Sequence, residues 1–167
     1  MAEALLISRS DITKHTSLNG SIDVDVYLNY IKIAQDKHIQ QFLGTDLFES
    51  IQSKITGGTL TGDYLNLVTE YVKPMLIHWS MVEALPFLGI QIANNGIFRP
   101  TSENGSALPK EEVDYLIEKE RDTAQYYTER FIDYMSHNAA SKFPEYYTNT
   151  NEDVSPTKDS DYEGWVL

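Results

Sequence analysis

Apolar residues recur every three or four positions along much of the chain, which is the spacing of one face of an α-helix. This pattern predicts helices at residues 8–16, 23–43, 45–56, 61–86 and 109–137. The fourth of these segments is the most apolar, so we expect it to form the centre of the core. The sequence therefore predicts a mainly α fold, a small bundle of four to five helices.

Glycine and proline residues mark where the helices should end or bend. Gly44 can adopt the left-handed conformation that ends a helix, and Thr45 can cap the next one, so these two helices should form a tight corner. Pro74 lies inside the most apolar segment. Because proline lacks an N–H and collides with the preceding turn, we expect a kink or break near Lys73. Pro86 should end that helix.

The spacing of apolar residues changes from helical to alternating after the fourth predicted helix. Ile90 and Ile92 flank a polar residue, and an Asn-Gly pair follows at Asn95 and Gly96. Asn-Gly between apolar runs favours a two-residue turn between antiparallel strands. We therefore predict a β-hairpin inserted near residues 87–102, with its tip at Asn95-Gly96.

The end of the sequence, residues 139–167, is polar and acidic and lacks helical periodicity. We therefore divide the chain into a helical domain at residues 1–138 and an extended acidic C-terminal arm at residues 139–167. Two clusters with aromatic side chains interrupt the arm. They contain Phe143, Pro144, Tyr146, Tyr147, Tyr162, Trp165, Val166 and Leu167.

These clusters are out of place in a segment that only solvates the protein, because disordered tails are poor in aromatic residues. Tyrosine and tryptophan are enriched where proteins bind one another. We therefore predict that the clusters contact a protein partner. One specific hypothesis is that Trp165, Val166 and Leu167 form a terminal anchor in a partner's pocket.

The charge of the chain narrows the range of partners. With 13 basic and 25 acidic residues, the formal net charge is −12. A general phosphate-binding surface is disfavoured, because affinity for nucleic acids comes largely from Lys and Arg. Two interpretations remain open: a solvated acidic surface that keeps the protein soluble, or an acidic channel wall along which DNA slides without binding.

Other classes of site lack their usual residues. The absence of cysteine excludes disulfides and thiolate chemistry. None of the four histidines has a metal-ligand spacing, so we interpret Asp133 and His137 as a surface pair and His78 as a core histidine with a backbone partner. No phosphate loop, nucleophile elbow or paired carboxylates stand out. We expect no catalytic, cofactor-binding or metal site, and an enzyme is disfavoured.

The N-terminus does not have the pattern of a signal peptide, and no apolar run is long enough to cross a membrane. We therefore expect the protein to be made in the cytoplasm and to have no membrane partner.

Three groups of residues occur in an order that resembles a known family. The first group is Ile31-x-x-Ala34-Gln35-Asp36 with Leu43-Gly44-Thr45-x-Leu47-Phe48. The second group is Ala84-Leu85-Pro86-Phe87 with residues 90–96. The third group is Arg121, Ala124 and Tyr127, followed by Phe143-Pro144-Glu145-Tyr146. In this order, residues 7–147 resemble the small head–tail connector proteins of tailed phages, also called adaptor or head-completion proteins.

The resemblance implies a structural protein of the virion neck, made in the cytoplasm of the host bacterium. It implies a ring, usually a dodecamer, that stacks under the portal protein, extends the DNA channel and offers a platform to other neck and tail proteins. DNA would only pass through it, without specific binding. The hairpin tip at Asn95 and Gly96 would then contact a neighbouring subunit or the portal. The alternatives are another neck or tail-completion subunit, or a small phage regulator that binds a host protein.

Overall fold

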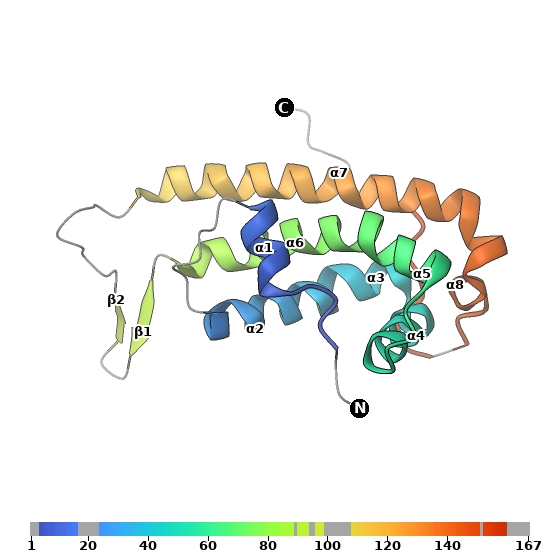
Figure 1. Ribbon diagram of the computed structural model, residues 1–167. Coiled ribbons are helices and arrows are strands. Elements are labelled where there is room, and N and C mark those ends of the chain that lie inside the picture. The colour runs from blue at the N-terminus through green and yellow to red at the C-terminus, as the bar shows by residue number, and fades with distance from the viewer. Residues whose placement is uncertain are drawn as a thin grey trace.

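The computed structural model shows an elongated helical bundle (Figure 1). It describes residues 4–16, 24–88, 90–93, 96–98, 108–150 and 152–159. Its helices, in chain order, are α1 (Arg9–His15), α2 (Val24–Ala34), the π-helix η1 (Gln35–Ile39), α3 (Gln40–Leu43), α4 (Thr45–Thr56), α5 (Gly62–Leu67), the π-helix η2 (Val68–Val72), α6 (Lys73–Leu88), α7 (Lys110–Lys142) and α8 (Pro144–Thr148).

The fold is mainly α, as the sequence predicts. Helix α2 runs through η1 into α3 without a break, and α5 runs through η2 into α6, so the described part of the chain forms six continuous helical stretches. The predicted number of four to five is too low. The additional helix is α8, which lies among the residues predicted to form an extended arm.

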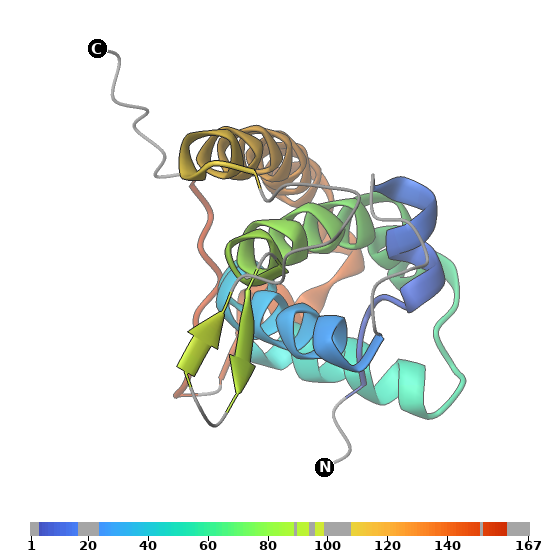
Figure 2. The ribbon, with the colours of Figure 1, turned by 90° about the vertical axis from the view of Figure 1, so that its left-hand side faces the viewer.

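Helix α6 is the centre of the bundle, which confirms the expectation for the most apolar segment. It lies between α2 on one side and α7 on the other (Figures 1 and 2). Its buried residues are distributed around the helix instead of along one stripe: Met75, Leu76, Ile77, Ser80, Met81, Val82 and Ala84. A helix that is apolar on most of its sides needs neighbours on most of its sides, and α2 and α7 supply them.

The helix is disturbed but not broken at Pro74. Proline cannot donate a hydrogen bond to the carbonyl of Glu70, four residues earlier. The π-helical turn η2 precedes it, and Nη1 of Arg130 in α7 donates to the freed carbonyl oxygen at 3.2 Å. A π-turn is a common way for a helix to absorb such a defect. Pro86 does not end the helix either, since α6 continues to Leu88.

A buried glutamine in η1 holds the N-terminal segment. Gln35 is 1% exposed, and its side-chain oxygen accepts a hydrogen bond from the amide of Leu6 at 2.9 Å. Its side-chain nitrogen donates to the carbonyl of Ala4 at 3.2 Å. Buried amides require such partners, so Gln35 fixes the segment that leads into α1 and places Leu6 and Ile7 in the core.

Strand structure is limited to six described residues. Strands β1 (Gln91–Ala93) and β2 (Gly96–Phe98) pair antiparallel, with Ala93 opposite Gly96. The hairpin with its tip at Asn95-Gly96 is not seen in the predicted form, because Gly96 belongs to β2. Asn95 lies outside the described residues.

The predicted arm is, as far as residue 159, part of the bundle. Helix α7 crosses the predicted boundary and ends at Lys142, and Phe143 is fully buried. The segment of residues 152–159 then runs back along α3 and α4: the amide of Thr45 donates to the carbonyl of Val154, and the amide of Thr157 donates to that of Gln41, both at 2.9 Å. Figure 2 shows this segment on the opposite side of α6 from α1.

We predict that Gly44→Ala detaches this returning segment. Gly44 has φ 75° and ψ 157°, a region that side chains rarely adopt, and an added Cβ would lie 2.6 Å from Cγ of Pro156. Gly58 has φ 65° but nothing within 4 Å of its Cβ position, so Gly58→Ala is the matched control.

The control should cost about 1–2 kcal/mol in the free energy of unfolding from backbone strain alone. Gly44→Ala should cost more in urea denaturation. It should also accelerate hydrogen exchange at the amide of Thr157. The proposed packing would be contradicted if the two variants lost equal stability and hydrogen exchange at the amide of Thr157 were unchanged in Gly44→Ala.

Candidate interaction surface

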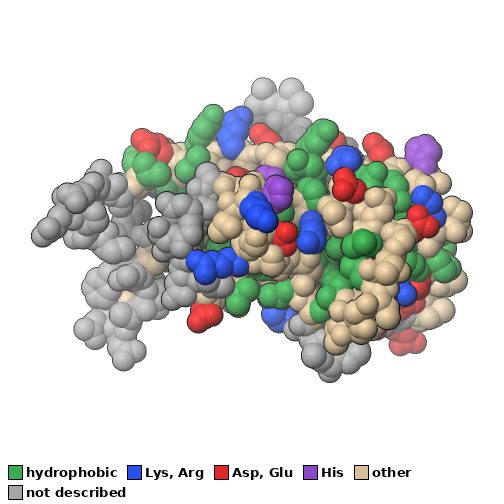
Figure 3. Space-filling model, viewed as in Figure 1, with side chains coloured by type: hydrophobic (Ala, Val, Ile, Leu, Met, Phe, Trp, Pro, Cys, Tyr) green, Lys and Arg blue, Asp and Glu red, His purple; other side chains and the backbone are tan. Residues whose placement is uncertain are grey.

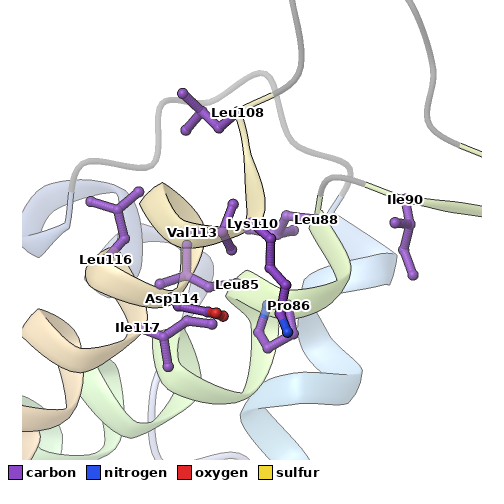
Figure 4. Close-up of a pocket in the computed structure, with 10 residues that line it drawn as sticks. All are labelled: Leu85, Pro86, Leu88, Ile90, Leu108, Lys110, Val113, Asp114, Leu116 and Ile117. Atoms are coloured by element: carbon purple, nitrogen blue, oxygen red, sulfur yellow. The ribbon is translucent and has the colours of Figure 1, made fainter.

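An apolar groove lies where the C-terminal end of α6 meets the first turns of α7. It has a volume of about 440 Å³. It is lined by Leu85, Pro86, Leu88, Ile90, Leu108, Lys110, Val113, Asp114, Leu116 and Ile117 (Figure 4). Apart from Lys110 and Asp114 the lining is apolar. We call this site the distal groove.

Several large apolar side chains at the same end of the bundle remain in contact with solvent. Leu108 is 48% exposed and Leu116 is 42% exposed, and both line the groove. Phe87 is 46% exposed at the end of α6, and Ile97 of β2 is 69% exposed. Single exposed apolar residues are ordinary, but a cluster around a groove is typical of a binding site.

The groove exists because the first half of α7 packs on one side only. The buried residues of α7 begin only at Ala124: Ala124, Thr128, Phe131, Met135 and Ala139. No residue of α7 before Ala124 is buried, although Val113, Leu116 and Ile117 continue the apolar stripe. Within the described residues, this part of the stripe lines the groove together with the end of α6 and remains partly open.

A charged depression adjoins the distal groove and shares Pro86, Asp114 and Ile117 with it. Its charged residues are Lys37, Glu83, Asp114, Glu118 and Arg121. An apolar centre bordered by charged groups is the usual arrangement of a protein-binding surface.

The best-defined ionisable cluster lies beside this depression. Nε2 of His38 is 2.8 Å from Oε1 of Glu83, and Nζ of Lys37 is 2.7 Å from the same oxygen. The His38 ring stacks on Trp79, with the ring centres 4.0 Å apart. The indole N–H of Trp79 donates to Thr128 of α7 at 3.0 Å. The cluster therefore ties η1 to α6, and α6 to α7.

Burial lowers the pKa of His38, and this outweighs the opposing effect of Glu83. For Glu83, burial raises the pKa, but the hydrogen bonds from Lys37 and His38 outweigh it and the net shift is downward. His38 therefore resists protonation in the folded state, whereas Glu83 favours its charged form. Such a pairing stabilises the fold and does not by itself make a catalytic site.

His78 and His137 also have structural partners. Nδ1 of His78 lies 2.7 Å from Oε2 of Glu120, so the prediction of a backbone partner for His78 is wrong. Nδ1 of His137 lies 2.8 Å from the backbone carbonyl oxygen of Asp133, not from its carboxylate. Within the described ranges, no three His, Asp or Glu side chains gather in a way that could hold a metal ion.

None of the described helices combines the length and the apolar character that crossing a bilayer would require.

The structure separates the residues predicted to contact partners. Phe143 and Tyr146 are 0% and 4% exposed, so they are core residues without surface for a partner, and the prediction for them is wrong. Pro144 begins α8 and is exposed, and Tyr147 is exposed with Nζ of Lys158 5.0 Å from its ring centre. Gly96 is in β2. The remaining residues lie outside the described part of the chain: Asn95, Tyr162, Trp165, Val166 and Leu167.

Sequence reasoning missed the residues of the distal groove. In the helices predicted at residues 61–86 and 109–137, the helical spacing of apolar residues includes Leu85 in the first and places Val113, Leu116 and Ile117 on the apolar stripe of the second. The periodicity correctly indicates which face they share, but it does not reveal whether another element covers that face. The signal available was the polar run at residues 99–107, which contains no large aliphatic or aromatic residue that could cover this face.

We predict that His38 makes the stability of the protein depend on pH. Its pKa lies below the ordinary value of 6.5, so the unfolded chain takes up a proton more readily and the free energy of unfolding should fall as the pH drops below about 6.5. The contribution of Glu83, whose ordinary pKa is 4.5, should be lost only at lower pH.

His38→Phe keeps a ring on Trp79 and removes the titrating group. The free energy of unfolding, measured by urea denaturation between pH 7.5 and 5, should therefore depend less steeply on pH in this variant than in the wild type. Identical slopes would contradict the role assigned to His38.

Comparison with known proteins finds one family. Residues 39–156 match the model of DUF6712, which is described as a family of unknown function. The match extends from the last residue of η1 to Pro156, and so includes α6, α7, the distal groove and most of the returning segment. No curated protein and no solved structure matches the chain. Because the match covers more than half of the sequence, the chain belongs to the DUF6712 family.

Proposed function

We propose that this protein is a structural subunit of a phage head–tail connector ring in the neck of the virion. In this role it binds copies of itself and the portal protein, extends the DNA channel and receives other neck or tail proteins. The observation that carries the proposal is the distal groove with its exposed apolar rim. The chain has a complete core of its own, so an open apolar site at one end is best explained by association with another protein.

The distribution of charge also supports a ring. Neighbours in a ring meet through two different faces of the same chain. One face, around α1, carries Lys14 and His15, beside Lys73, which pairs with Asp11 at 3.4 Å; Figure 3 shows basic side chains and a histidine gathered there. The first half of α7 exposes carboxylates instead: Glu111, Glu112, Glu118 and Asp122. Unlike charges on separate faces favour contact between one copy and the next.

The acidic character of the chain suits a DNA channel as well. With a net charge of −12, the surface as a whole does not attract phosphates. A wall of this kind lets a duplex pass without being held.

Reconstitution with the portal ring of the same phage tests the function directly. Purified subunit is mixed with purified portal, and the complexes are imaged by electron cryomicroscopy. We expect a ring of subunits stacked coaxially on the portal. A ring at another place in the neck would identify a different neck or tail-completion subunit. A chain that stays monomeric or dimeric beside the portal would contradict the connector role.

We predict that Leu116→Asp weakens this assembly at least a hundred-fold, because an unpaired carboxylate is costly to bury in an apolar contact. The matched control is Leu65→Asp. Leu65 is a leucine of nearly equal exposure, 45% against 42%, and it lies on α5.

Both substitutions replace side chains already in contact with water, so the thermal stability of the isolated subunit should change little in either variant. Binding measured by mass photometry should be lost only for Leu116→Asp. Equal effects of the two substitutions on binding would show that the distal groove is not part of the assembly contact.

A further inference from the structure

We propose that a depression beside α1 receives the outward face of α7 from a second copy of the chain, so that copies associate head to tail. This inference rests on the proposed connector function and deepens it, because it names the two surfaces through which neighbouring subunits meet. The distal groove takes no part in this contact.

The depression lies where α1 and the π-turn η2 meet α6 and α7. It has a volume of about 460 Å³. It opens on the side of the bundle that carries α1, where Figure 3 shows basic side chains and a histidine. We call it the α1 depression. Its titratable lining residues are the bases His15, Lys73, His78 and Arg130 and the acids Asp11 and Glu70.

Positive charge prevails at the α1 depression although the chain as a whole is acidic. Nη1 of Arg130 donates to the backbone carbonyl of Glu70 at 3.2 Å, which orients the guanidinium group without neutralising it. Lys14 on α1 is exposed and forms no ion pair within the described ranges. Lys73 is paired with Asp11 at 3.4 Å. These three permanent cations outnumber the two carboxylates before either histidine of the lining is protonated, so the site favours an anionic occupant.

The side of α7 turned away from α6 has the opposite charge. Its residues recur every three or four positions, and all of them are exposed: Glu111, Tyr115, Glu118, Asp122, Tyr126 and Glu129. We call this surface the acidic face. Among the described residues, its carboxylates form one ion pair, between Asp122 and the exposed Lys119 at 3.8 Å. The acidic face therefore has carboxylates available to a basic partner.

The two tyrosines of the acidic face indicate that the partner is a protein. Tyr115 is 58% exposed and Tyr126 is 62% exposed. Tyrosine is enriched at protein interfaces, because its ring offers a large contact area and its hydroxyl group can form hydrogen bonds. The α1 depression suits such an occupant, since Thr69 and Tyr127 add hydroxyl groups to its charged lining.

The charges select a head-to-tail contact between copies. A two-fold contact between two acidic faces would bring carboxylates against carboxylates, which opposes association. An acidic face against the α1 depression of the next copy instead brings carboxylates near Lys14, His15 and Arg130. Figures 1 and 2 show α1 and α7 on different sides of α6, so one copy can use both surfaces at once. A contact of this kind repeats from copy to copy and closes into a ring where the rotation allows.

Two charge-reversed variants test this contact on the isolated chain. Lys14→Glu with His15→Glu reverses the border of the α1 depression, and Glu111→Lys with Glu118→Lys reverses the acidic face. All four side chains are exposed, so thermal unfolding followed by circular dichroism should change little in either variant.

Self-association is then measured by sedimentation equilibrium at low salt. Each variant alone should associate at least about ten-fold more weakly than the wild type, because like charges now face each other. An equimolar mixture should regain the wild-type association. In the mixture, the reversed acidic face of one variant meets the reversed depression of the other, and the unchanged surfaces meet at the alternate contacts.

The matched control is Glu49→Lys with Glu152→Lys, which changes the net charge as much as the reversal of the acidic face does. Glu49 lies on α4 and Glu152 in the returning segment, away from both surfaces. This control should associate at least as tightly as the wild type. The proposal is overturned if the wild type stays monomeric, if either reversed variant associates as well as the wild type, or if the mixture does not regain association.

Imaging the same proteins with the portal separates this contact from the connector function. A complete ring of either reversed variant alone on the portal would discard the contact and leave the function in place. Self-association of the wild type with no ring on the portal would discard the function and leave the contact between copies.

Discussion

Helix α6 has too many apolar sides for any single neighbour to cover, and the other helices of the bundle pack around it so that most of these sides are buried. Helix α2 packs on one side, α7 on the other, and α1 and the N-terminal segment close part of the remaining surface. The six helical residues after Val82 include Pro86 and lead to the end of the bundle that forms the distal groove. The same property that makes α6 the centre of the core therefore produces the distal groove at its C-terminal end.

Polar groups inside the bundle are placed where the backbone would otherwise lack partners. Pro74 leaves the carbonyl of Glu70 without its usual donor, and Arg130 of α7 supplies one. Gln35 serves the amide of Leu6 in the same way at the other π-turn. Trp79 fills the space between His38 and α7 and also satisfies its own N–H on Thr128. These contacts fix how α2 and α7 sit on α6 more narrowly than apolar packing does, because hydrogen bonds require particular distances and directions.

Local patterns predicted the helices well and the long-range contacts poorly. The period of apolar residues identified the long helices and the central position of α6. The defect at Pro74 also followed from the chemistry of proline, but the donor to the freed carbonyl of Glu70 is Arg130, sixty positions from Glu70 in the sequence. The return of residues 152–159 onto α3 and α4 rests on backbone bonds such as Thr157 to Gln41, which any sequence can form and no composition reveals. For that reason Phe143 and Tyr146, read as contacts for a partner, belong to the core.

Helix α7 divides into a part that holds the fold together and a part that is open to another protein. Its buried residues begin at Ala124, whereas Leu116 in the preceding turns is exposed. A substitution at Leu116 can therefore change an association with little change in the stability of the chain. A large-to-small substitution at Phe131 or Met135 leaves a cavity in the core and lowers the free energy of unfolding instead.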